Sequence, residues 1–341
     1  MTTFRFRCRT HELDIASCLT AGQTFRWGRD GESFWLSDGA LVYHLRQDES
    51  GVDVSTTGSR ADFDFLFDLD RDYQQVRESI LDAAPELADS LRPLTGLRLM
   101  RQSSPVEVLF AFLCTQNNHL ARIHQMVDRL VSLPRGAAVP PALAGIAEET
   151  EASHARLDMP RGRIGSREIE GQAIAFEDGA SAGGTAAPLW GEFPPLNILA
   201  SQAEGFFRDL GFGYRARSVV GAAQMALSLG GEAWLESLRQ ASYENAHGAL
   251  TQLPGIGPKV ADCVCLYGLH HMRAVPVDVH IWNAAVDRYF PEWREKSLTP
   301  QRYQAIAGLF RDKFGDLAGH AQQMVFVDRL RRPRKAKAKR D

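Results

Sequence analysis

Residues 253–284 constrain the fold of this chain more than any other stretch, and they read LPGIGPKVADCVCLYGLHHMRAVPVDVHIWNA. Ser242 is a candidate cap for a preceding helix. The apolar residues of that helix recur on one face as Ala246, Leu250 and Leu253. Pro254-Gly255 ends this helix, and Gly257-Pro258 begins another, with proline in the first turn, where its missing N–H is not needed. The pattern predicts a helix, a tight hairpin and a second helix.

The hairpin glycines, Gly255 and Gly257, expose backbone N–H groups at the start of the second helix. Such groups favour a phosphate oxygen, because the helix N-terminus carries a partial positive charge. Contacts with phosphate carry no information about base identity. We therefore expect this hairpin to bind the DNA backbone without reading its sequence.

Two charged residues of this stretch are candidates for chemistry. Lys259 lies in the first turn of the second helix, where the helix N-terminus and a partly dry pocket favour a neutral, nucleophilic amine. A solvated lysine that only touches phosphate is the alternative. Asp278 follows 278 − 259 = 19 residues later and precedes an amphipathic run, so it is a candidate N-cap. A capping carboxylate is held ionised, and the same charge stabilises a developing sugar cation.

The stretch resembles the helix-hairpin-helix DNA glycosylases, in which a Gly/Pro-rich loop is followed by a catalytic aspartate. LPGIGPKVADCVCL and AVPVDVHIW are most similar to the eukaryotic-type 8-oxoguanine DNA glycosylase/AP lyases. The resemblance implies that neutral Lys259 attacks C1′ of an extruded nucleotide while Asp278 stabilises oxocarbenium character. A Schiff base and β-elimination would follow, cutting the strand 3′ to the lesion.

The resemblance also assigns the lesion pocket. Gly22, in LTAGQTFRW, would place its carbonyl where it accepts a hydrogen bond from the N7–H that the oxidised guanine has and normal guanine lacks. The residues alone suggest only a turn between two strands. Phe326 would stack on the base and Gln322 would meet its Watson–Crick edge; core packing is the default for the phenylalanine. Cys263, one turn from Lys259, would line the pocket and favour the neutral amine.

Contacts with DNA are implied for a further set of residues. In LCTQNNHLARI, Asn117 and Arg122 would contact the cytosine left behind, and the family's third asparagine is replaced by a histidine. In GFGYRAR, composition favours a buried Tyr214 and an exposed Arg215. The resemblance instead makes the tyrosine a wedge and gives the arginine a hydrogen bond to the estranged cytosine. His280 would lie beside the lesion phosphate.

One departure from the family concerns the support of that histidine. The family has an acid three places after the pocket phenylalanine, where this chain has Arg329, with Asp328 one place earlier. The sequence therefore leaves open what orients the histidine ring.

Composition narrows the class of protein. The 341 residues carry a net charge of −3, so any DNA-binding surface must be local. The five cysteines include no CxxC pair and no four-cysteine cluster, so we expect no disulfide framework, zinc, iron–sulfur centre or other cofactor. No signal peptide or apolar run of membrane-spanning length is present, which predicts a protein that is not secreted.

The chain order predicts an α+β fold. Alternating runs in residues 1 to about 60 predict an antiparallel sheet, and from about residue 63 the spacing is helical. Ser104 to Glu107 reads as a capping box. The expected division is a sheet domain at 1–90, a helical domain at 91–330 with a flexible insertion at 134–190, and a basic disordered tail at 331–341 that could add weak nonspecific attraction to DNA.

We therefore expect a monomeric, bifunctional glycosylase and AP lyase that excises 8-oxoguanine opposite cytosine from double-stranded DNA. It would act in the cytoplasm or nucleoid of a bacterium, or in a eukaryotic nucleus. One alternative is a monofunctional alkylbase glycosylase, which keeps the aspartate but lacks the lysine. The other is a noncatalytic DNA-binding protein that uses its hairpin only for phosphate, and so binds without releasing a base.

Overall fold

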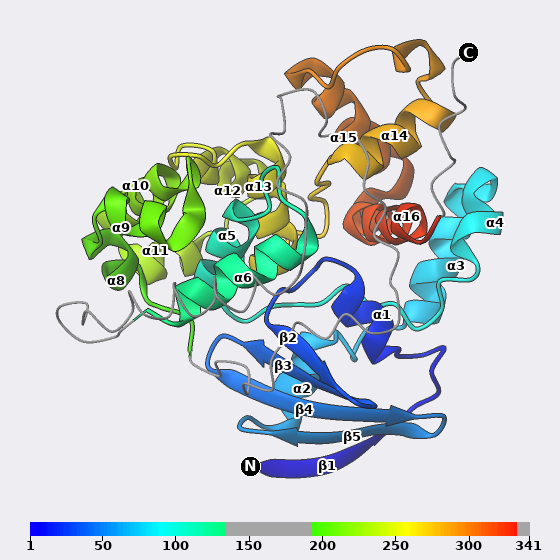
Figure 1. The fold of residues 1–341 in the computed structure, drawn as a ribbon. Coiled ribbons are helices and arrows are strands. Elements are labelled where there is room, and N and C mark those ends of the chain that lie inside the picture. The colour runs from blue at the N-terminus through cyan, green and yellow to red at the C-terminus, as the bar shows by residue number, and fades with distance from the viewer. Residues whose placement is uncertain (134–191, 333–341) are drawn as a thin grey trace, which may run out of the picture.

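The computed structural model describes residues 1–133 and 192–332. The expected insertion at 134–190 and nearly all of the basic tail lie outside these residues. The described chain forms an antiparallel sheet and two groups of helices, so the predicted α+β class is confirmed (Figure 1). In the view of Figure 1 the sheet lies below, with one helical group above it on each side.

The sheet has five antiparallel strands in the order β1-β5-β4-β3-β2. The strands are β1 (Thr2–Arg7), β2 (Trp27–Asp30), β3 (Ser33–Asp38), β4 (Leu41–Asp48) and β5 (Gly51–Thr56). Alternate side chains of β3, β4 and β5 face a core that includes residues of α1 (Ile15–Thr20) and α2 (Arg60–Leu66). The sequence analysis missed α1, so Gly22 follows a helix rather than joining two strands.

The first helical group packs around α5 (Pro105–Leu113), every residue of which is buried. Its other members are α6 (Leu120–Val131), α8 (Leu196–Ser201), α9 (Glu204–Phe207), η2 (Arg208–Phe212), α10 (Arg215–Ser228), α11 (Gly231–Ser237), α12 (Tyr243–Leu250), α13 (Pro258–Cys263) and η3 (Val264–Gly268).

The second helical group has a separate core. It comprises α3 (Tyr73–Ala83), η1 (Pro85–Leu87), α4 (Ala88–Leu91), α14 (Val279–Arg288), η4 (Pro291–Trp293), α15 (Pro300–Phe314), η5 (Gly315–Leu317) and α16 (Ala318–Arg331). Helices α3 and α4 lie before residue 92 in the chain, yet their apolar side chains pack with those of α14, α15 and α16. The domain boundary at residue 90 stays a prediction.

A buried ion pair joins the sheet to α5. Ser104 caps α5, since its Oγ accepts from Glu107 N, but the expected capping box does not form. The Glu107 carboxylate instead accepts from Arg26 Nη1 at 2.7 Å and from Gly39 N at 3.0 Å. The box is wrong because a buried arginine that is distant in sequence offers this acid a charged partner.

All five cysteines are free and buried. Within residues 1–133 and 192–332, no helix has both the length and the apolar character required to cross a bilayer.

Candidate active site

A cleft of about 740 Å³ lies where the two helical groups meet the loop after α1. This volume is in the range of pockets that hold drug-sized molecules. Most of the residues expected at the site line it: Gly22, Asn117, Gly255, Gly257, Lys259, Cys263, Asp278, His280, Gln322 and Phe326. Arg122, Tyr214 and Arg215 are not among the lining residues.

The helix-hairpin-helix forms the wall that carries the lysine. Helices α12 and α13 flank the hairpin, with Ser242 capping the first and Gly257 at the N-cap of the second. Gly255 has φ +79°, and a Cβ at this position would lie 2.2 Å from Ser218 Oγ. Glycine is therefore required by both backbone conformation and space. Helix α13 continues as the π-helix η3, a distortion that is frequent at functional sites.

Lys259 projects from the first turn of α13 toward the end of α5. Its Nζ donates to Thr115 Oγ1 at 3.1 Å and lies 5.2 Å from the centroid of the Phe112 ring. Phe112 stacks on Tyr267, with centroids 5.2 Å apart and planes at 9°. The amine is thus bordered by a neutral hydroxyl and an aromatic ring.

Asp278 caps α14, as its position in the sequence predicts. One carboxylate oxygen, Oδ1, accepts from His280 N at 3.0 Å and Ile281 N at 2.9 Å. These two bonds fix the carboxylate at the edge of the cleft that Lys259 also lines. An amine and an anchored carboxylate therefore share one cavity.

Cys263 is 2% exposed beside the lysine. Burial raises the pKa of its thiol to about 12, although the Lys259 charge opposes the shift. The thiol is therefore protonated at neutral pH and adds no anion beside the amine.

Gly22, Gln322 and Phe326 line another part of the same cleft. Gly22 has φ +67°, and a Cβ there would lie 3.3 Å from Phe326 Cε1. The Phe326 ring meets the His280 ring edge-on, with centroids 5.4 Å apart. Gln322 donates from Nε2 to Pro276 O at 3.2 Å, while its buried Oε1 has no hydrogen-bond partner within the described residues. A buried acceptor without a partner is costly unless a ligand satisfies it.

Three expected DNA contacts gather around the backbone of Gln116. Asn117, at φ +49°, donates from Nδ2 to Tyr214 Oη at 3.3 Å. The Arg215 guanidinium donates to the Gln116 carbonyl and lies 4.4 Å from the Tyr214 ring centroid. Tyr214 is 56% exposed and Arg215 is 7% exposed, so the expectation from composition was the reverse of what is found. The arginine is buried because a distant carbonyl accepts its hydrogen bond.

Arg122 lies apart from this group. Its Nη2 donates to Gly211 O at 2.7 Å and its Nη1 to Gln125 Oε1 at 3.3 Å. His119 caps α6, since its Nδ1 accepts from Arg122 N at 3.4 Å.

The sequence left open what orients the His280 ring, and the two residues at and beside the family's acid position pair with other side chains. Arg329 pairs with Asp287, and Asp328 pairs with Arg332 at 2.7 Å. Within the described ranges, no hydrogen bond is found for the ring nitrogens of His280.

The sequence analysis missed several residues that line the cleft. Thr115 bonds Lys259, and Gln116 donates from Nε2 to Gly255 O at 2.6 Å. Tyr303 and Leu298 approach from the segment around the start of α15. A polar pair shortly after a mostly apolar helix was the signal for the first two residues.

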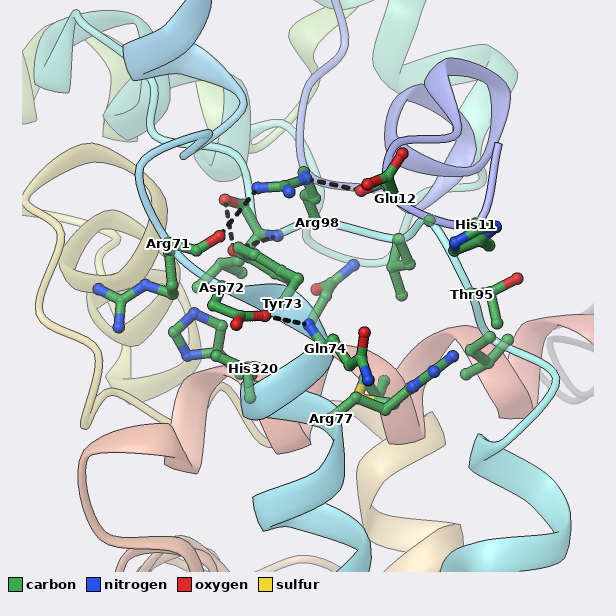
Figure 2. Close-up of a pocket in the computed structure, with 17 residues that line it drawn as sticks. His11, Glu12, Arg71, Asp72, Tyr73, Gln74, Arg77, Thr95, Arg98 and His320 are labelled. Atoms are coloured by element: carbon green, nitrogen blue, oxygen red, sulfur yellow. Dashed lines mark hydrogen bonds between the residues drawn. The ribbon is translucent and has the colours of Figure 1, made fainter. Parts of the chain in front are cut away.

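A second cavity, of about 400 Å³, lies between the start of α3, residues 94–99 and α16 (Figure 2). His320 and Met324 of α16 line it, whereas Gln322 and Phe326 line the first cleft. Since residues two apart project from different sides of a helix, α16 separates the two cavities. Asp72 lines the second cavity and caps α3, with Oδ1 accepting from Gln74 N at 2.9 Å and from Gln75 N at 3.1 Å.

The chain is similar to known proteins over most of its length. Residues 5–109 match the family model of the 8-oxoguanine DNA glycosylase N-terminal domain. The chain is 32% identical over 333 residues to the N-glycosylase/DNA lyase OGG1 of Arabidopsis thaliana, covering 94% of this chain and 79% of the relative. It is 29% identical over 343 residues to the N-glycosylase/DNA lyase of Saccharomyces cerevisiae, covering 92% and 79%.

Among solved structures, the chain resembles the Clostridium acetobutylicum 8-oxoguanine glycosylase/lyase, whose crystal structure is in complex with double-stranded DNA containing cytosine opposite 8-oxoguanine. The TM-score is 0.70 at 20% identity, over 96% of this chain and 97% of the other, so this likeness concerns the fold. From the Arabidopsis relative and the matching N-terminal domain, we conclude that the chain belongs to the 8-oxoguanine DNA glycosylase/AP lyase family.

Proposed function

We propose that this protein removes 8-oxoguanine from double-stranded DNA and then cleaves the strand at the resulting sugar. The observation that carries the proposal is that Lys259 and Asp278 line the same cleft as Gly22, Gln322 and Phe326. A nucleophile, an anion and a surface for a flat base are thus available to one extruded nucleotide.

The reaction begins when the neutral Lys259 amine attacks C1′ of the flipped nucleotide. The bond from C1′ to the base breaks, its electrons leave with the base, and a proton is taken up there. Positive charge develops on the sugar, and the Asp278 carboxylate stabilises it from its fixed position at the start of α14. The hydrogen bond to Thr115 Oγ1 holds the Lys259 amine in the cleft.

The amine then loses its proton and the sugar ring opens, which leaves a Schiff base between Lys259 and C1′. Loss of a C2′ proton breaks the bond from C3′ to its oxygen, so the strand is cut on the 3′ side of the lesion. Hydrolysis of the Schiff base releases the lysine. The lyase step therefore needs Lys259, which monofunctional glycosylases lack.

Recognition of the base falls to the far end of the cleft. Phe326 stacks on the purine, and the Gly22 carbonyl accepts the N7–H that distinguishes the oxidised base. The unpartnered Gln322 Oε1 supports this assignment, because a buried acceptor is satisfied by an N–H on the Watson–Crick edge.

The opposite strand meets the cluster around Gln116. We assign Tyr214, as an exposed ring, to fill the space that the flipped nucleotide vacates. Asn117, Arg122 and Arg215 contact the estranged cytosine; the two arginines must exchange their bonds to Gly211 and Gln116 for bonds to the base. Cytosine preference is therefore expected to depend most on Arg215, which lies against the tyrosine.

The hairpin N–H groups at Gly255 and Gly257 and the His280 ring are assigned to phosphates flanking the lesion. All of these groups belong to one chain, so a monomer is sufficient for the reaction. We propose that the protein acts in the compartment of the cell that contains the DNA.

A panel of duplexes tests the proposal. Each carries 8-oxoguanine, an alkylated base or normal guanine, paired in turn with each of the four bases, and base release and nicking are scored separately. Release and nicking at 8-oxoguanine opposite cytosine is expected. Release of alkylated bases without nicking would support the monofunctional alternative, and binding without release would support the noncatalytic one.

A further inference from the structure

A carboxylate that the proposed reaction does not use lies directly behind the lysine. Asp262 is three residues after Lys259 on α13 and is fully buried, at 0% exposure. Tyr243 donates to its Oδ1 at 2.6 Å, and Tyr303 donates to its Oδ2 at 2.5 Å. Burying a carboxylate this completely is costly unless the hydrogen bonds around it serve the structure in a specific way.

The Tyr303 hydroxyl makes a second contact that crosses between the two helical groups. It accepts from Val277 N at 3.2 Å, and Val277 is the residue before Asp278. One hydroxyl therefore joins α13, which carries the lysine, to the segment before α14, which carries the aspartate. Tyr303 itself comes from α15, so three elements meet at this oxygen.

The rest of the cluster faces away from the cleft. His247 Nε2 lies 3.9 Å from Asp262 Oδ2, and Arg311 Nη1 donates to Tyr243 Oη at 3.3 Å. Burial raises the pKa of Asp262, and His247 and the two tyrosine hydroxyls oppose the shift. Tyr243 thus holds the same carboxylate as Tyr303, but within the residues that the structure describes it has no contact with the segment before Asp278.

We propose that Asp262 and Tyr303 are positioning residues that set the separation between the Lys259 amine and the Asp278 carboxylate. The Asp262–Tyr303–Val277 chain fixes the start of α14 relative to the first turn of α13, so that both groups reach one sugar. This inference rests on the proposed function, and neither residue touches the reacting atoms in it. Because misplacement by about 1 Å costs about 100-fold in rate, such a link matters for the step that needs both groups.

The two tyrosines give a matched pair of variants. Tyr303→Phe removes the hydroxyl that reaches Val277, whereas Tyr243→Phe removes a hydroxyl from the same carboxylate without touching that segment. Each is measured for single-turnover base release from 8-oxoguanine DNA, for borohydride trapping on a preformed abasic site, and for DNA affinity. The abasic reaction needs Lys259 but not the stabilisation of base departure.

For Tyr303→Phe we expect base release to fall by roughly 10- to 100-fold, while abasic-site trapping and DNA affinity change by less than about threefold. Tyr243→Phe is expected to keep all three within about threefold. Equal losses of base release in the two variants, or equal losses of release and abasic trapping in Tyr303→Phe, would overturn the inference, because both point to general destabilisation.

Asp262→Asn is the second variant if Tyr303→Phe does not fold, since it weakens the same link from the α13 side. It should show the same split between base release and abasic trapping, and a parallel loss of both would contradict the proposal. Wild-type protein that releases no 8-oxoguanine overturns the proposed function itself. If the wild type is active but the variant loses base release and abasic-site trapping in parallel, only the positioning role is overturned.

Discussion

Replacing Asp278 with asparagine separates its role as a helix cap from the electrostatic role that we propose for it. The carboxylate Oδ1 accepts from two backbone N–H groups at the start of α14. An asparagine oxygen accepts the same two bonds, and aspartate and asparagine are about equally good N-caps. The substitution therefore removes the negative charge while leaving the helix start nearly unchanged.

The expected magnitudes differ widely between stability and rate. The free energy of unfolding should change by less than about 0.5 kcal/mol, because the cap survives. Removing one preorganised electrostatic group at a transition state costs about 2.7–4 kcal/mol, which is about 100- to 1,000-fold in rate. Excision should therefore slow by at least about 100-fold, with little change in DNA affinity.

Asp72 supplies the control. It caps α3 with the same two-bond geometry but lies on the second cavity, across α16 from the active-site cleft (Figure 2). Asp72→Asn should match Asp278→Asn in urea denaturation and leave single-turnover excision unchanged. If Asp278→Asn keeps more than a tenth of the wild-type rate, or loses DNA affinity in proportion to rate, the electrostatic role is refuted.

Three further changes test other parts of the account. Arg215→Ala should reduce the preference for cytosine over other opposite bases by about tenfold, as for loss of one base contact, and an unchanged preference in competition assays would count against that contact. Gly22→Ala should slow excision by more than about tenfold. At φ +67° alanine is strained by about 1–2 kcal/mol, and the added methyl would lie 3.3 Å from Phe326. Wild-type kinetics in this variant would show that this part of the cleft does not hold the base. Burial, then the charge of Glu107, raises the pKa of Asp38 from 3.8 to about 7. The folded protein therefore binds more protons at this carboxyl than the unfolded chain does between these values, so the stability that Asp38 contributes is fully present below pH 4 and is lost as pH rises through 7. Asp38→Asn should remove about 3 kcal/mol of the decline between pH 5 and pH 8 in urea titrations, and an equal decline in both proteins would show that this carboxyl is not the source.

Local patterns in the sequence were sufficient for much of this fold. The strands, the helix starts at Ser242 and Asp278, and the hairpin between α12 and α13 all follow from signals within a few residues. Caps and turns are set by short-range hydrogen bonds, so short-range patterns predict them. Helix α1 was missed because it has only 6 residues. So short a helix shows too little periodicity of apolar residues to be recognised between strands.

The errors concern contacts between residues far apart in the chain. Glu107 leaves its expected capping box for Arg26, and Arg215 is buried because the Gln116 carbonyl accepts from it. Each residue pattern is ambiguous until the partner is known, since charged side chains are buried only where a partner is available.

The proposed catalytic pair, Lys259 and Asp278, could be named from the sequence, but the residues around it could not. The residues that hold it, Thr115 beside Lys259 and Tyr303 beside Val277, come from other segments of the chain. Neither hydroxyl belongs to a motif, and neither is marked by hydrophobic spacing. Resemblance to a family supplied the roles of the residues that match its motifs. The contacts that position those residues are visible only in three dimensions.

The most direct test of the account is covalent trapping with borohydride on a duplex that carries 8-oxoguanine opposite cytosine. Reduction should link wild-type protein to the strand, and Lys259→Gln should form no such product while still binding the duplex. A trapped complex that persists in Lys259→Gln at the wild-type level would contradict the assignment of the nucleophile.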